Sequence, residues 1–259
     1  MTLPPESPPP LEPVLEPVLE PVLAPQPAPP PPGAARPLLV ALVTTIVVTA
    51  VSYLTPDRYA ATAVGVTFLA ATWWLVLRRD GRVIRAHGLS LGGLLEPEPL
   101  EARRILRDAL QAAAWAAGLA VVVFPAFWVG FRLYWHPHTH FSLRLPGSVF
   151  DEVAGQFVVI ALPEEAFFRG YLQTALDEAW PPRLRVLGAR IGPGLLVSAA
   201  IFAVGHLLTI RHPARLAVFF PALVFGWLRA RTGGIGASVA FHATCNLFSA
   251  ALMRGYGLG

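Results

Sequence analysis

The sequence predicts an all-α fold, a polytopic transmembrane helical bundle of about seven spans with a disordered N-terminal arm. Three observations lead to this prediction. Hydrophobic residues make up 54% of the 259 residues and charged residues only 14%, against about 25% charged residues in a typical soluble domain. Apolar runs long enough to cross a bilayer recur along the chain. The first 36 residues differ from the remainder because proline is so frequent there.

The N-terminal arm, residues 1–36, contains a perfect tetrapeptide repeat. The unit Leu-Glu-Pro-Val occurs three times between Leu11 and Val22. Proline at every fourth position excludes a continuous helix, so we expect an extended, disordered, proline-rich arm. No basic region precedes an apolar core, as it would in a signal peptide. We expect a tether, and recognition by a partner is the alternative.

Seven apolar segments follow the arm and are predicted to span the membrane. They cover residues of about 38–55, 59–77, 109–131, 148–172, 194–210, 215–230 and 234–253. In domain terms, residues 37–86 form two N-terminal transmembrane helices, residues 87–108 an amphipathic interfacial stretch, and residues 109–259 the membrane core, with its motifs in 164–246.

The distribution of arginine predicts the orientation of the chain. With the N-terminus in the cytoplasm, the inner segments carry thirteen arginines and the outer segments six. This asymmetry follows the positive-inside rule. The basic residues lie in loops between apolar spans, so the lipid bilayer is their expected partner and nucleic acid is excluded. All basic residues are arginine, and alanine, leucine, glycine and proline are abundant, which is typical of a GC-rich genome. We therefore expect an integral protein of a bacterial inner membrane.

Polar side chains interrupt three of the predicted spans, where they are costly and therefore rarely accidental. They occur as Glu164, Glu165 and Arg169 in the fourth span, His206 in the fifth, and His242 and Asn246 in the seventh. Residues four apart share one face of a helix. Glu165 is therefore expected to pair with Arg169, which would neutralise both charges, whereas Glu164 points about 100° away.

The predicted depths of these groups are similar. Glu164 and His242 each lie eight residues from the inner end of their span, which is a depth of ~12 Å. The corresponding depth of His206 and Asn246 is ~18 Å. The four side chains are therefore expected to share one layer in the cytoplasmic half of the bilayer.

Two kinds of chemistry fit these residue types. A desolvated carboxylate can act as a general base, a histidine can hold water, and an asparagine amide suits an oxyanion. Such a set can hydrolyse an amide with activated water. Alternatively, Glu164, His206 and His242 could hold a divalent metal such as zinc with a water in the open position. The single cysteine, Cys245, excludes a disulfide framework and a multi-cysteine zinc site.

The three motifs in this order resemble the CPBP family of intramembrane proteases, which includes CAAX prenyl endopeptidases and bacteriocin-processing and immunity proteins. The resemblance covers residues of roughly 148–253 and rests on Glu164, Glu165, Arg169, Phe202, His206, His242 and Asn246.

The resemblance implies a helical bundle whose cavity opens to the cytoplasm or the bilayer. It implies that Glu164 activates water and that His206 helps to position that water. His242 and Asn246 would stabilise the oxyanion, and Arg169 would hold Glu165 in place. The substrate would be a peptide or a membrane-anchored protein, with a prenylated protein, a bacteriocin leader and a C-terminal sorting signal as alternatives.

Two other functions compete with an endopeptidase. A non-enzymatic immunity or scaffold protein of the same family would share every motif. A transporter could use Glu164 and the histidines as a proton relay, but transporters often show repeated halves with broken helices, and this sequence contains no such repeat.

Overall fold

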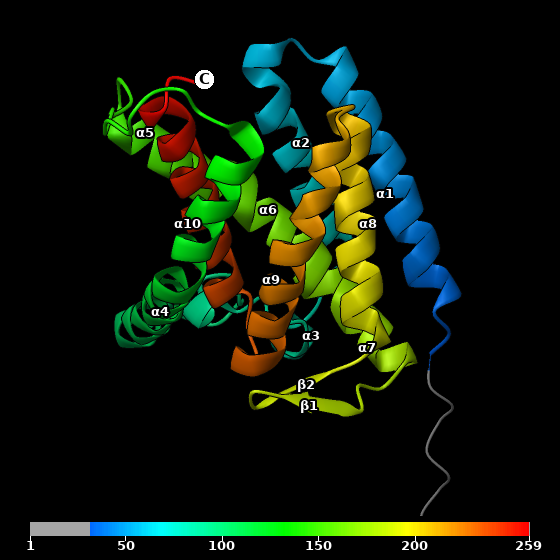
Figure 1. The fold of residues 1–259 in the computed structure, drawn as a ribbon. Coiled ribbons are helices and arrows are strands. Elements are labelled where there is room, and N and C mark those ends of the chain that lie inside the picture. The colour runs from blue at the N-terminus through cyan, green and yellow to red at the C-terminus, as the bar shows by residue number, and fades with distance from the viewer. Residues whose placement is uncertain (1–31, 259) are drawn as a thin grey trace, which may run out of the picture. The chain divides into compact units, whose positions relative to one another are not determined.

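The computed structural model describes residues 32–258, and Figure 1 shows their arrangement. The proline-rich arm predicted for residues 1–36 lies almost wholly outside the described residues. The first helix begins at Ala35, so its first turn overlaps the end of that predicted arm.

The chain is mostly helical, as predicted from its composition. In chain order the helices are α1 (Ala35–Leu54), α2 (Asp57–Thr72), α3 (Gly81–Ala86), α4 (Ala102–Trp135), α5 (Val149–Ala154), α6 (Leu162–Glu165), α7 (Thr174–Ala179), α8 (Pro193–Thr209), α9 (Phe219–Thr232) and α10 (Gly236–Gly255). Short 3₁₀ turns at Leu91–Gly93 and Pro213–Val218 precede α4 and α9. The π-helical turn Trp73–Leu77 extends α2.

Four helices of the described residues are long and apolar enough to cross a membrane. They are Ala35–Leu54, Asp57–Leu77, Ala102–Trp135 and Pro213–Thr232. A helix also occupies each of the other three predicted spans, but α8 has only 17 residues, and the fourth span carries Glu164, Glu165 and Arg169. The chain therefore has the architecture of a helical membrane protein, while the count of about seven spans stays a prediction.

A small antiparallel hairpin was not expected from the sequence. Strands β1 (Leu184–Val186) and β2 (Ala189–Ile191) pair with Leu184 opposite Ile191. Leu187 and Gly188 form the turn with positive φ angles, as two-residue hairpins require. The hairpin lies at the same end of the bundle as α3 and α7 in Figure 1. Segments predicted to be cytoplasmic therefore share one end.

One continuous helix, residues 149–179, forms the centre of the bundle. It consists of α5, α6 and α7 joined by the π-helical segments Gly155–Ala161 and Ala166–Gln173. Every residue from 163 to 173 is buried. Helix α6 lies between α4 and α10 on one side and α1, α2, α8 and α9 on the other (Figure 1). Residues 163–173 are consequently shielded from lipid by their neighbours.

A charge cluster organises the segment between α3 and α4. The side chain of Glu96 is 1% exposed and accepts hydrogen bonds from Arg85 at 2.5 Å and from Arg104 at 2.6 Å. Ser90 accepts a further bond from Arg104 at 3.0 Å. The hydrogen bond from Arg104 is the main reason why the pKa of Glu96 falls from 4.5 to about 2, against the opposing effect of burial. The cluster ties the interfacial stretch to both flanking helices.

We expect Glu96→Gln to lower the thermal unfolding midpoint of the purified protein at pH 7, because the variant loses two charge-assisted hydrogen bonds. A carboxyl whose pKa is depressed on folding stabilises the fold above its unfolded pKa, and the stabilisation is lost as the pH falls through the folded value. The gap between wild type and variant should therefore shrink below about pH 4.5 and close near pH 2.

Glu98→Gln is the matched control, since Glu98 is 48% exposed and contacts only Arg85, at 3.3 Å. Its substitution should leave the midpoint nearly unchanged. Equal losses in the two variants would contradict the buried role of Glu96.

Candidate active site

The site lies on α6, whose backbone departs from a regular helix. Pro163 has no N–H and cannot make the usual helical hydrogen bond to a preceding carbonyl. π-Helical segments lie immediately before and after α6. Such segments often mark functional positions because they change the direction of the side chains that follow them. The local sequence thus places Glu164 and Glu165 on an irregular, fully enclosed stretch of helix.

Glu165 is the buried centre of the site, with a side chain that is 0% exposed. Its Oε1 atom accepts a hydrogen bond from Arg169 Nη1 at 3.0 Å, one helical turn later. Arg169 also donates through Nη2 to the carbonyl oxygen of Ala222 on α9, at 3.1 Å. Its guanidinium lies over the ring of Phe202 on α8, 4.5 Å from the centroid. The pair therefore connects the central helix to α8 and α9.

His242 on α10 reaches the same carboxylate from the opposite side. Its Nδ1 atom lies 2.9 Å from Glu165 Oε1. A carboxylate can only accept, so Nδ1 carries the proton and the Nε2 atom of the neutral ring is left as an acceptor. Nε2 lies 3.7 Å from Glu164 Oε2. This separation is too long for a direct hydrogen bond.

Aromatic rings hold the two histidines. The ring of Phe225 stacks on His242 with centroids 4.6 Å apart. The ring of Phe202 contacts His242 edge-on at 5.9 Å and His206 at 4.3 Å. His206 Nδ1 lies 3.0 Å from the Phe202 carbonyl oxygen. By the same argument its Nε2 atom is the free acceptor. Phe202 thus contacts two imidazoles that both carry their proton on Nδ1.

Asn246 lies one turn beyond His242 on α10 and is half-buried. Residues four apart share a helix face, so its amide follows His242 along the same side of α10. The structure therefore brings Glu164, Glu165, Arg169 and His242 into one connected cluster. His206 adjoins this cluster through Phe202, and Asn246 extends it along the helix.

Glu164 is the second buried carboxylate of the site. Its residue is 9% exposed, and its Oε2 atom has no hydrogen-bond partner among the described residues. A buried polar atom without a partner calls for a specific explanation, of which a catalytic role is one. Oε2 of Glu165 has no partner either, so the two adjacent glutamates differ in that Glu165 holds Arg169 and His242 through Oε1, whereas Glu164 approaches only His242, at 3.7 Å.

The geometry does not fit the metal site that we considered from the sequence. Among residues 32–258, no three histidine, cysteine, aspartate or glutamate side chains are arranged to hold a metal ion. The candidates Glu164, His206 and His242 come from three helices, and the ring of Phe202 contacts both imidazoles. We therefore derive no step through a metal.

Two contacts of the site could not be foreseen from the motifs. The sequence predicted the Glu165–Arg169 pair from its spacing, but it gave no sign that His242 shares the same oxygen. Phe225, which stacks on His242, lies in an apolar run of α9 where it looks like any other packing residue. Both contacts depend on how α9 and α10 pack against the central helix.

Fold and site together define a helical integral membrane protein with a buried carboxylate–histidine site. Residues 147–248 match the Rce1-like family model, described as type II CAAX prenyl endopeptidase Rce1-like. The matched segment is thus similar to the CAAX prenyl endopeptidases of that family, and it contains every predicted site residue. The resemblance seen in the motifs is confirmed over this part of the chain. Among curated proteins and among solved structures, nothing matches the chain.

Arg169→Met should lower the free energy of unfolding by about 3–5 kcal/mol, because it leaves the Glu165 charge buried without its ion-pair partner. Unfolding in detergent, followed by tryptophan fluorescence, measures the change. Arg185→Met is the control, since Arg185 lies exposed on β1, and surface substitutions usually fall within about 0.5 kcal/mol of wild type.

A double variant checks the cause. Adding Glu165→Gln to Arg169→Met should recover part of the lost stability, because the uncompensated charge is removed. If the double variant is as unstable as the sum of the two single ones, packing rather than charge explains the loss.

Proposed function

We propose that this protein is an intramembrane endopeptidase in which Glu164 activates the water that hydrolyses a peptide bond. The observation that carries the proposal is the pair formed by Glu164 Oε2 and His242 Nε2, 3.7 Å apart. One atom belongs to a carboxylate and the other is the free acceptor of a neutral imidazole. A water molecule between them would be held by both of its protons. The match to a family of CAAX prenyl endopeptidases supports a protease.

In the proposed reaction, Glu164 alone accepts and returns the transferred proton. The water oxygen attacks the peptide carbonyl carbon while one water proton passes to Glu164. The tetrahedral intermediate then collapses, the C–N bond breaks, and Glu164 returns the proton to the departing amine. A carboxylate beside the attacking water is suited to this task because it can act first as general base and then as general acid.

The other side chains have supporting roles. The resemblance assigned His242 to the oxyanion, but a neutral ring that donates through Nδ1 to Glu165 offers an acceptor at Nε2. We therefore propose that His242 orients the water and that His206, with the same tautomer, assists it. Asn246 has an amide N–H that can donate to the oxyanion. Arg169 fixes Glu165, which in turn fixes His242.

The substrate that fits this placement is a peptide or a membrane-anchored protein cut at the cytoplasmic side of the bilayer. Glu164 lies midway along the helix of residues 149–179, and the arginine distribution predicts that the end carrying α7 and the hairpin is cytoplasmic. A prenylated protein is the substrate class named in the description of the matched family. A bacteriocin leader or a C-terminal sorting signal is handled by the same chemistry.

Glu164→Gln should reduce cleavage of a membrane-anchored reporter peptide by about 10²–10⁴-fold, because an amide cannot accept the water proton. The enzyme is reconstituted in vesicles, and product is measured by mass spectrometry. Glu178→Gln is the control, since Glu178 lies on α7, is exposed and is remote from His242. Cleavage that survives Glu164→Gln would refute the mechanism. Wild-type protein that cleaves no reporter of any of the three substrate classes would favour a non-enzymatic immunity or scaffold function.

Asn246→Ala should lower kcat by roughly 10²–10³-fold, which is typical for the loss of one oxyanion donor. KM should change little, because the interaction forms only in the transition state. Steady-state kinetics on the same reporter separate the two constants. A rise in KM at constant kcat would instead assign Asn246 to substrate binding.

Exhaustive chelation should leave cleavage unchanged, because the described residues supply no three-ligand metal set. The rate is compared before and after dialysis against a chelator, with total zinc measured by elemental analysis. Activity that is lost and then restored by zinc alone would assign the protein to the metal-dependent class.

A further inference from the structure

A second cavity lies behind the candidate active site. Its volume is about 740 Å³, within the range of sites that bind small molecules. It is bounded by α4, α10, the central helix and the interfacial stretch before α4. On α10 it is lined by Gly236, Ala237, Ala240 and Thr244. Val239, three residues before His242, also lines it, but Glu164, His206, His242 and Asn246 do not. The cavity is therefore separate from the site that contains Glu164.

The shape of the cavity suits an extended chain. Along α4 its lining residues run from Arg104 to Ala117, which corresponds to ~20 Å at 1.5 Å per residue. One leaflet of the hydrocarbon core is roughly 15 Å thick. Ala113 and Ala117 line the cavity and are exposed, so it is open to the side along α4. A chain lying in the surrounding leaflet could enter by this side opening.

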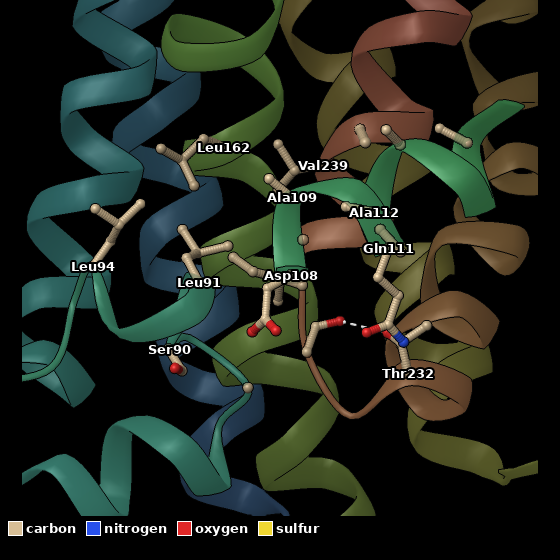
Figure 2. A pocket seen from close by; sticks show the side chains of 18 of the residues that line it. Ser90, Leu91, Leu94, Asp108, Ala109, Gln111, Ala112, Leu162, Thr232 and Val239 are labelled. Carbon is tan, nitrogen blue, oxygen red and sulfur yellow. Dashed lines mark hydrogen bonds between the residues drawn. The ribbon is translucent and has the colours of Figure 1, made fainter. Parts of the chain in front are cut away.

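The two ends of the cavity differ in polarity. Figure 2 shows Ser90, Asp108 and Thr232 at one end and Leu162 and Val239 at the other. Alanines on α4 form most of the wall between them. An elongated cavity with one polar end and one apolar end has the shape and polarity of an amphiphile that places a single long apolar chain in it.

The charges at the polar end favour an anionic headgroup. Arg85 and Arg104 line it, with side chains 42% and 33% exposed, whereas the Glu96 carboxylate that holds them is 1% exposed. The guanidinium groups thus cover the carboxylate. Among acidic neighbours, Glu98 contacts Arg85 at 3.3 Å, and Asp108 pairs with Arg107 at 3.4 Å. Arg104 forms its ion pair with the buried Glu96, and Asp108 also lies near enough to interact with it. Its side chain is 33% exposed, so a phosphate can reach the guanidinium.

We propose that this cavity binds one acyl chain of an anionic phospholipid of the cytoplasmic leaflet, with its phosphate at Arg104. Basic pockets between transmembrane helices on the cytoplasmic side are typical binding places for such headgroups. The bound chain lies against both α4 and α10, which pack on each other through Ala116 and Ala240, and so braces α10, which carries His242 and Asn246. The inference is independent of the proposed proteolytic activity.

Native mass spectrometry of the full chain tests the proposal with palmitoyl-oleoyl phosphatidylglycerol as the probe. Ala113→Trp fills the cavity from its exposed side and should weaken lipid retention by roughly tenfold, or ~1.4 kcal/mol. Ala114→Trp is the matched control, because Ala114 is equally exposed on α4 and does not line the cavity. Equal retention by the two variants would overturn the assignment of the site.

The headgroup is tested by charge. Arg104→Gln should abolish the preference for phosphatidylglycerol over palmitoyl-oleoyl phosphatidylcholine, Arg104→Lys should keep it, and Arg103→Gln on the exposed side of α4 should not affect it. Wild-type protein that retains both lipids equally would overturn the anionic headgroup. A lipid-linked peptide is tested as a competitor. If it displaces phosphatidylglycerol and Ala113→Trp blocks this displacement, the cavity is a substrate-binding site and the proposal is overturned.

Discussion

The Glu165 carboxylate is the point on which the rest of the structure depends. A charge without water and without partners would be prohibitively costly in this interior. One oxygen of Glu165 is satisfied by Arg169 and by His242, and Arg169 is satisfied in turn by the carbonyl oxygen of Ala222. The central helix is thereby joined to α9 and α10 by hydrogen bonds that cannot form anywhere else. Apolar packing alone would let these helices slide, whereas this network fixes their register.

The same network gives the adjacent Glu164 and Glu165 different surroundings. Glu165 is committed to structure because all of its surroundings are protein. Glu164, about 100° further round the helix, keeps one oxygen without a partner beside His242. His242 contacts both glutamates. Its hydrogen bond to Glu165 through Nδ1 sets the tautomer, and therefore leaves Nε2 as the atom that faces Glu164. Glu165 thus fixes the orientation of the histidine beside Glu164, as orienting groups do in many active sites.

The membrane explains why the polar groups are gathered in layers. The charge cluster around Glu96 lies where the chain passes from α3 to α4, and it replaces water for a buried carboxylate with two arginines. It also forms the rim of the cavity behind α10. The interfacial stretch therefore has two roles, because it ties α3 to α4 and it presents positive charge where lipid headgroups are found.

The sequence by itself determined the fold class, the positions of the helices and the seven residues of the motifs, because apolar periodicity and spacing of three or four are local properties of a helix. Glu165 and Arg169 illustrate this, since their pairing needs only one turn. Tertiary packing decided the remainder. The bond between His242 and Glu165 joins residues 77 positions apart, and the stacking of Phe225 requires α9 to lie against α10. The hairpin of three-residue strands was missed because such short segments carry no periodic signal, and the cavity behind α10 exists only once α4 has packed against it.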